Sequence, residues 1–338
     1  MNNGLGMRRR EFISLVGSAA AFPTGLAGEV FGQTSPTQTW PARPIKLIVP
    51  SGPGLSADVL ARLMSERLSH QLGQQMFVEN IAGAAGMVGG QAAARAVPDG
   101  YTLYLGLAAA LSSNLFLFKS VPYDPIRDFT PVAMVSESGP FVISVQSELP
   151  FKGLPDLVSY AKANPGKLSY GIDASSGYQV VIGQLLTKRA GIDMVQVPYR
   201  STAQVMQDTA AGTTQLMISA VAAVEGFVQS GKVRRIAITS SQRFPGLEDL
   251  PTVAETLPDF RVDGWLAVVA PTGTPEPIVA RLNREIDIFI KAPETQLRLR
   301  AMGFATKSAG TPESIRGFIR SEIDAWGALV KELNIQPQ

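Results

Sequence analysis

Strand-like and helix-like segments alternate along most of this chain, and this alternation limits the possible folds more than any single motif does. Apolar segments of strand length, such as residues 45–49, 103–107 and 216–218, each lead into small residues and then into a helix-like segment. Such alternation predicts α/β domains in which a mostly parallel sheet is covered by helices on both faces. The 338-residue chain is too long for one ordinary core. We therefore expect two α/β domains.

Two segments are candidates for the passages between these domains. A Glu-Ser-Gly-Pro segment at residues 137–140 is a candidate hinge between two separate strand-like segments, and residues 262–269 would cross back. We expect domain 1 to comprise residues 40–139 and 262–338, and domain 2 to comprise residues 140–261. The two crossings would act as hinges beside a cleft, between domains that barely touch without ligand.

The N-terminal segment has the pattern of an export signal. Three arginines at residues 8–10 precede a short apolar run that ends in small residues, and this run is shorter than the roughly 20 apolar residues that span a membrane. The arginine pair followed after one residue by Phe12 resembles a twin-arginine signal. We expect residues 1–32 to be a signal peptide and residues 33–39 a linker, the alternative being an ordinary N-terminal extension. The mature protein would then lie in the periplasm.

The loops after the strands form the candidate ligand site, because ligands of open α/β sheets bind outside the carboxyl ends of the strands. These loops are built mostly of Gly, Ala, Ser and Thr, and each opens a predicted helix. They offer backbone N–H groups, hydroxyls and positive helix ends, which suit an anion, although small residues also serve simply in turns and caps. The candidate ligand-binding residues are Gly54, Leu55, Ser56, Asp58, Gly83, Ala84, Ala85, Gly86, Ala109, Ser112, Asp173, Ser175, Ser176, Tyr178, Gln179, Arg200, Ser201, Thr202 and Ser219.

Catalytic and cofactor motifs do not fit these loops. Gly83, Gly86 and Gly89 follow a G-x-x-G-x-x-G spacing, whereas a dinucleotide site needs G-x-G-x-x-G and an acidic residue after the next strand. The sequence has no P-loop and no G-x-S-x-G elbow. We expect no cofactor and no catalysis. The alternative is an exported hydrolase or lyase that uses Asp58 or Asp173.

Composition narrows the possible functions further. The chain has no Cys and one His, which excludes thiol catalysis, disulfides and the His/Cys clusters of most zinc sites, so we expect no metal. The charge of +2 is not concentrated in a basic stripe with interleaved aromatics, so we expect no nucleic-acid partner. The single histidine, His70, lies far from the start of its predicted helix and is expected to be a surface residue.

Several short segments, in the right order along the whole mature chain, resemble the Bug family, the periplasmic solute receptors of tripartite tricarboxylate transporters. They are Trp40-Pro41-x-x-Pro44-Ile45, Val78-Glu79-Asn80-x-x-Gly83-Ala84-x-Gly86, Pro98-Asp99-Gly100-Tyr101-Thr102-Leu103, Asn164-Pro165-Gly166-Lys167-Leu168, Val197-Pro198-Tyr199, Leu250-Pro251-Thr252-Val253-Ala254-Glu255 and Val269-Ala270-Pro271-x-Gly273-Thr274-Pro275.

This resemblance implies a two-domain periplasmic-binding-protein fold, a Venus flytrap of type II-like topology. It also implies a monomer that binds a small carboxylate and delivers it to membrane permease subunits. In that family the loops of the first domain hold a carboxylate largely through backbone N–H groups, hydroxyls and ordered waters. A sensory receptor that presents its ligand to a membrane signalling protein is the alternative.

The chain departs from the usual family residues at positions that bear on the ligand. Polar residues of many relatives are replaced at Ala57, Ile81, Val180 and Ala220, and apolar bulk is added at Leu55 and Tyr178. A second charge on the ligand would lose partners there, at a cost of several kcal/mol for a buried ion. We therefore expect an apolar acid to bind more tightly than citrate or glutamate, with Arg200 as the one cation that could hold a second carboxylate.

Overall fold

The computed structural model describes residues 40–173 and 177–337, which belong to one compact unit, residues 39–338. The expected signal peptide at residues 1–32, the linker at residues 33–39, and the candidate site residues Ser175 and Ser176 lie outside the described residues.

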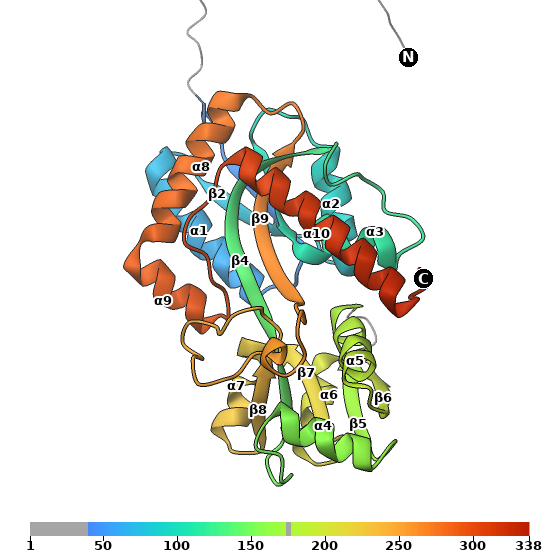
Figure 1. Ribbon diagram of the computed structural model, residues 1–338. Coiled ribbons are helices and arrows are strands. Elements are labelled where there is room, and N and C mark those ends of the chain that lie inside the picture. The colour runs from blue at the N-terminus through green and yellow to red at the C-terminus, as the bar shows by residue number, and fades with distance from the viewer. Residues whose placement is uncertain (1–39, 174–176, 338) are drawn as a thin grey trace, which may run out of the picture. The chain divides into compact units, whose positions relative to one another are not determined.

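One half of the sheet contains the three N-terminal strands (Figure 1). Strand β1 (Ile45–Val49) pairs in parallel with β2 (Met76–Asn80) and with β3 (Thr102–Leu107). Strand β9 (Asp263–Pro271) then runs antiparallel to β3 and to the first part of β4 (Phe129–Gln146). The resulting order is β2-β1-β3-β9-β4.

The other half of the sheet is built on the second part of β4. Strand β5 (Leu168–Asp173) lies between β6 (Met194–Tyr199) and β7 (Leu216–Ala220) and is parallel to both. Both β7 and β8 (Val233–Ile238) are antiparallel to β4. The α/β architecture expected from the alternating sequence is confirmed. The antiparallel pairs all involve β4 or β9, the two strands that pass between the halves.

The expectation of two separate strands around residues 137–140 was wrong, because β4 is one continuous strand through that segment. Gly139 pairs with Gly264 and Pro140 with Asp263, so the polypeptide stays extended where the sequence indicated a break. The register of β4 against β9 shifts between Ser136 and Gly139. Such an irregularity accommodates a Gly-Pro pair that a regular ladder would disfavour. β4 and β9 therefore run side by side from one half of the sheet to the other (Figure 1). We call the place where they pass between the halves, around Gly139 and Gly264, the crossing.

Helices cover both faces of the first half. Side chains alternate along β3, so that Leu103 and Leu105 share one apolar core with α1 (Ser56–Leu72) and α8 (Glu276–Lys291). The intervening Tyr104 packs instead on the other face, whose core includes residues of α2 (Met87–Ala94) and α10 (Pro312–Leu333). α9 (Pro293–Ala301) follows α8 and packs beside it.

The second half repeats this arrangement with shorter helices. One face packs against α4 (Leu154–Ala163) and α5 (Gly177–Ala190), and the other against α6 (Thr202–Ala210) and α7 (Val221–Gln229). None of the helices in the described residues is long and apolar enough to cross a membrane.

Candidate functional site

The strand register brings the predicted loops of both halves to the same region of the molecule. At its carboxyl end, β3 pairs Leu107 with Leu266, close to the crossing. At its carboxyl end, β7 pairs Ala220 with Phe141, on the other side of the crossing. Because β1 and β2 are parallel to β3, and β5 is parallel to β6 and β7, all the loops after these strands face the crossing from one side or the other.

The loop after β1 is held by a buried carboxylate. Asp58, in the first turn of α1, is 2% exposed; its Oδ2 accepts hydrogen bonds from the backbone N–H of Gly54 (2.9 Å) and from Arg62 Nε (3.0 Å), and its Oδ1 accepts one from Asn80 Nδ2 (2.8 Å). Burial alone would raise the pKa of Asp58, but these bonds from Arg62, Gly54 and Asn80 outweigh it and lower the pKa below its ordinary value. Asp58 therefore shapes the loop, and its oxygens are already occupied.

The next loop contains four successive residues in the left-handed region. Gly83, Ala84, Ala85 and Gly86 have φ values of 128°, 46°, 51° and 90°, a conformation that is strained for the two alanines. Hydrogen bonds fix the loop from the protein side: Asn114 Nδ2 donates to the Ala85 carbonyl at 3.0 Å.

The Gly86 carbonyl likewise points into the protein, where it accepts a hydrogen bond from the buried Tyr104 hydroxyl at 3.0 Å. The N–H of Met87, the first residue of α2, donates a hydrogen bond to the Ala84 carbonyl. The strained turn thus satisfies the first N–H of α2 within its own backbone.

The segment after β3 forms a π-helical turn, η2 (Ala109–Ser113), which leads into α3 (Asn114–Leu117). Ser112 is fully buried and donates its hydroxyl hydrogen bond to the Ala108 carbonyl at 2.6 Å. The buried Ser113 hydroxyl has no hydrogen-bond partner. Ala109 is partly exposed. Of these candidates, Ser112 serves the turn itself.

In the second half, two loops are joined by side-chain hydrogen bonds. Asp173 ends β5 instead of lying in the following loop; its N–H donates to Gln179 Oε1 at 2.6 Å, and its Oδ2 accepts from Thr202 Oγ1 at 3.0 Å. Ser201 caps α6, because its Oγ accepts from the Gln204 N–H. Arg200 is exposed.

Tyr178 and Ser219, both predicted site residues, lie on opposite faces of the second-half sheet. Ser219 pairs with Val142, whose side chain belongs to the core under α6 and α7. The adjacent residue Phe141 points to the other face, where its ring stacks on Tyr178 at 5.4 Å. The hydroxyls of both Tyr178 and Ser219 are buried without a hydrogen-bond partner.

The first turns of α1, α2 and α7 lack a side-chain cap, as does the π-helical turn η2, which follows β3. The N-cap residues of α1, α2 and α7 are Leu55, Gly86 and Ala220, none of which accepts a capping hydrogen bond. α4, α8 and α9 are also uncapped, but they do not follow strands that end at the crossing. α1, α2 and α7, like η2, each come after a strand that ends at the crossing, so their positive ends face that region.

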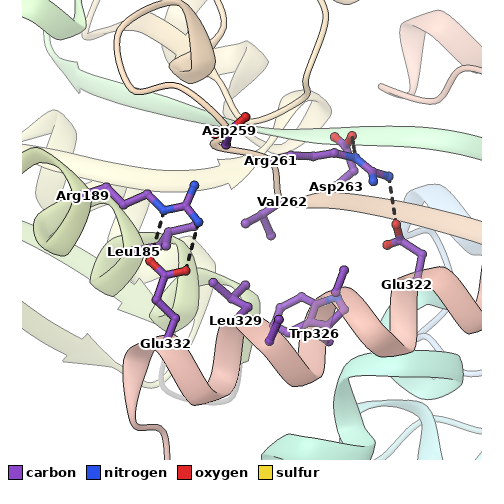
Figure 2. Close-up of a pocket in the computed structure, with 12 residues that line it drawn as sticks. Leu185, Arg189, Asp259, Arg261, Val262, Asp263, Glu322, Trp326, Leu329 and Glu332 are labelled. Carbon is purple, nitrogen blue, oxygen red and sulfur yellow. Dashed lines mark hydrogen bonds and ion pairs between the residues drawn. The ribbon is translucent and has the colours of Figure 1, made fainter.

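A charged cluster lies at the crossing itself (Figure 2). Arg261 contacts Asp263 (3.5 Å) and Glu322 of α10 (2.9 Å), and Glu322 also accepts a hydrogen bond from Trp265 Nε1 at 3.0 Å. Burial raises the pKa of Asp263 to about 6, with the nearby Glu322 adding to the rise and Arg261 opposing it. These residues attach the first residues of β9 to α10.

The two halves contact each other through α5 and α10. Arg189 of α5 forms an ion pair with Glu332 of α10 at 3.0 Å, visible at the left of Figure 2. The ring of Tyr178 packs edge-on against Trp326 of α10 at 4.8 Å. Tyr178 therefore fills space between the halves, and Leu55, which was expected to share a pocket with it, is 59% exposed.

Nothing in the described part of the chain resembles a metal centre, because no three His, Asp or Glu side chains gather there as a candidate ligand set. The sequence identified the loops but missed Arg62, Asn80, Tyr104 and Asn114, which position them. The spacing of Asp58 and Arg62, four residues apart on one helix, is the one signal of these contacts that the sequence carried.

Comparisons with known proteins find relatives along most of the chain. The TctC family model, described as "Tripartite tricarboxylate transporter family receptor", matches residues 60–335. The chain is 36% identical over 296 residues to Protein BugT of Bordetella pertussis, covering 87% of this chain and 90% of BugT. Rpa4515 of R. palustris, solved with adipate, superimposes with a TM-score of 0.78 at 33% identity, covering 88% of this chain and 100% of that chain. MatC of Rhodopseudomonas palustris, solved with bound malate, has a TM-score of 0.72 at 30% identity, covering 86% and 100%.

Proposed function

The chain belongs to the tripartite tricarboxylate transporter receptor family, as its resemblance to Bug proteins predicted, and we propose that it captures a small carboxylate at the crossing for transfer to the membrane subunits of such a transporter. Relatives of this fold solved with adipate and with malate support a carboxylate as the ligand class. The receptor is a monomer in this proposal, and it acts in the periplasm after export.

The observation that carries the proposal is the convergence of uncapped helix starts. No side chain accepts a hydrogen bond from the first turns of α1, α2 and α7 at the crossing, and only the first N–H of α2 has a backbone acceptor there, the Ala84 carbonyl. A carboxylate supplies acceptor oxygens and negative charge, both of which are favourable at a helix N-terminus. The strained turn of Ala84 and Ala85 supports the same reading, because strain of this kind is typically retained at functional sites.

The proposed role involves no catalysis. Asp58, one of the two candidate catalytic carboxylates, accepts hydrogen bonds on both oxygens and is 2% exposed. Asp173 accepts a hydrogen bond from Thr202 and ends a strand. These arrangements suit residues that shape loops better than residues that exchange protons with a substrate.

A cap introduced at α1 tests the proposal. In Leu55→Asp, a carboxylate at the N-cap would occupy the N–H groups that we assign to the ligand, stabilising the helix by about 1 kcal/mol. We expect calorimetric titration to show at least tenfold weaker binding of the carboxylates that the wild type binds. Gly153→Asp places the same side chain at the uncapped start of α4, away from the crossing, and should leave binding unchanged.

Two results would overturn the proposal. One is that Leu55→Asp binds carboxylates as tightly as the wild type does, and the other is that the uncharged amides of the same acids bind equally well. Release of product beyond one equivalent from any bound acid would favour the hydrolase or lyase alternative instead.

A further inference from the structure

A hollow of about 570 Å³ lies between the two halves beside the end of β8, and we call it the β8 hollow. The first half contributes part of α9 and residues 305–307, and the second half contributes residues 240–245, which follow β8. The remaining lining residues belong to the crossing and are Glu137, Ser138, Arg261 and Asp263. The volume is within the range of sites for small organic ligands, about 300–1,000 Å³.

Hydrogen bonds attach both walls of the β8 hollow to the strands of the crossing. In the first-half wall, the Ala305 N–H donates to the Ser138 carbonyl and the Glu137 N–H donates to the Ala305 carbonyl, both at 2.9 Å. In the second-half wall, the Thr239 hydroxyl, directly after β8, donates to the Val262 carbonyl at 2.6 Å. The hollow therefore has one wall from each half, and both walls are attached to the crossing.

The second-half wall lies where ligands of α/β sheets generally bind. β7 and β8 are both antiparallel to β4, so they are parallel to each other, and their last residues pair with Phe141 and Val142. The carboxyl end of β8 therefore also reaches the crossing, and ligands bind outside such ends. Residues 240–245 were not among the predicted loops, because no helix directly follows β8.

Cationic side chains outnumber acidic ones in the lining. The cations are Arg243, Arg261, Arg300 and Lys307, and the acids are Glu137 and Asp263. Arg261 contacts Asp263 and Glu322. Arg243 forms an ion pair with Glu255 at 2.8 Å. These two arginines therefore already have acidic partners.

The other two cations, Arg300 and Lys307, form no ion pair and no side-chain hydrogen bond within the described residues. Arg300 lies in the last turn of α9 and Lys307 in the segment that follows, and both are exposed. The pKa of Glu248, in the second half, is lowered mainly by a hydrogen bond from the Gly246 N–H and to a smaller extent by Arg300. Arg300 therefore faces the second half without pairing with it.

The opposite wall offers neutral donors. Ser241 and Gln242 are exposed, and their side chains form no hydrogen bond within the described part of the chain. A phosphate group presents oxygens in several directions, so it can accept hydrogen bonds from both walls at once, whereas the two oxygens of a carboxylate lie in one plane. Hydrogen bonds from arginine and lysine to such oxygens are stronger than those between neutral groups. The lining thus favours a phosphate-bearing ligand.

We propose that the β8 hollow is a second anion site, which binds a small molecule that carries phosphate groups and contacts both halves. The site is separate from the uncapped helix starts at which we place the carboxylate, because none of Leu55, Gly86 and Ala220 lines it. The inference therefore goes beyond the proposed function. Because the two walls belong to different halves, a bound anion would also favour the arrangement in which they face each other.

Inorganic pyrophosphate is the probe, because it carries several charged oxygens and no carboxylate. Calorimetric titration at low salt should show that it binds the wild type. Arg300→Gln and Lys307→Gln each remove one unpaired charge from the first-half wall, and each should raise Kd about fivefold. Gln242→Glu adds a negative charge to the second-half wall with little change of shape, and it should also raise Kd about fivefold if both walls contact the anion.

Two further variants serve as controls. Arg95→Gln is matched to the cation variants, because Arg95 is also exposed, forms no ion pair among the described residues and lies outside the hollow. It should leave Kd for pyrophosphate unchanged. Leu55→Asp, at the proposed carboxylate site, should likewise leave pyrophosphate binding unchanged while it weakens carboxylate binding.

The outcomes separate this inference from the proposed function. If the wild type does not bind pyrophosphate, or if Arg300→Gln and Lys307→Gln bind it as tightly as the wild type does, the second anion site is wrong and the carboxylate receptor stands. If Leu55→Asp abolishes pyrophosphate binding, the probe occupies the crossing and the assignment to the hollow is wrong. If a hexaglutamate peptide binds through Arg300 and Lys307 but pyrophosphate does not, these cations contact an acidic protein partner instead of a small molecule.

Discussion

Two buried aspartates near the crossing have opposite electrostatic environments. Asp58 accepts hydrogen bonds from Arg62, Gly54 and Asn80, and they keep its pKa below the ordinary value despite burial. Asp263 has one oxygen without a partner and faces Glu322 as well as Arg261, so burial raises its pKa to about 6. An ionised aspartate therefore stabilises the folded state at position 58 and destabilises it at position 263.

Asp263→Asn is expected to stabilise the protein at neutral pH. The pKa of Asp263 is about 4 in the unfolded chain and about 6 in the folded protein, so between these pH values the folded protein holds a proton that the unfolded chain releases. Wild-type stability therefore falls as pH rises through this window. Asparagine does not ionise and avoids this loss. Urea unfolding should show the variant more stable by about 1–2 kcal/mol at pH 7.5, with the difference lost near pH 4.

Asp58→Asn is the control with the opposite sign. A depressed pKa contributes stability above the unfolded value of about 4, and this stability is lost only as pH falls through the lower folded value. The variant should be less stable by about 1–2 kcal/mol at pH 7.5. Equal effects of both substitutions at pH 7.5 would show that the assigned environments are wrong.

At the scale of elements, the turn before α2 stores strain that a single substitution should release. Ala85 has a φ of 51°, a conformation that costs an alanine about 1 kcal/mol but suits glycine. Ala85→Gly is expected to raise the free energy of unfolding by a few tenths to about 1 kcal/mol. The greater freedom of the turn should at the same time weaken carboxylate binding.

Ala92→Gly provides the matched control for this turn. Ala92 is exposed within α2, where glycine costs about 1 kcal/mol, so the same substitution should lower stability there and leave binding unchanged. Urea unfolding measures the stability of both variants. If Ala85→Gly loses as much stability as Ala92→Gly does, then Ala85 is not strained in the wild type.

Helices and strands with strong patterns were predictable from sequence. α8 and α10 are examples, because their apolar residues repeat at helical spacing and their starts carry Pro, both of which predict a helix. β4 was not predictable as one strand, because Gly139 and Pro140 are strand breakers locally. Their tolerance depends on pairing with β9, more than a hundred residues later.

The loops of the candidate site were predictable from the sequence, but the residues that position these loops were not. The loops at residues 54–58 and 83–86 stand out because small residues follow apolar strands. Tyr104 and Asn114 hold the turn at residues 83–86, but they lie 18 and 29 residues after the residues that they bond and individually look like ordinary core residues. Their contacts with the turn depend on how β3 and α3 pack against it, which no local pattern encodes.

At the scale of the whole molecule, ligand binding and contact between the halves should be coupled. A carboxylate that touches loops from both halves favours the arrangement in which α5 meets α10, and any contact made only in that arrangement adds to the apparent affinity. The Arg189–Glu332 ion pair is such a contact in our proposal, because one partner lies on α5 and the other on α10.

Arg189→Gln is therefore expected to weaken ligand binding without a ligand contact of its own. The pair is partly exposed, at 27% and 35% for the two side chains, so its loss should cost about 0.5–1 kcal/mol and raise Kd two- to fivefold at low salt. Added salt screens exposed charges, and at about 1 M the wild type and the variant should converge. Arg284→Gln removes the same charge and an ion pair to its neighbour Glu285 within α8, so it should leave Kd unchanged at any salt concentration. Calorimetric titration at both salt concentrations measures the effect. If Arg189→Gln matches Arg284→Gln at low salt, then contact between α5 and α10 does not contribute to ligand capture.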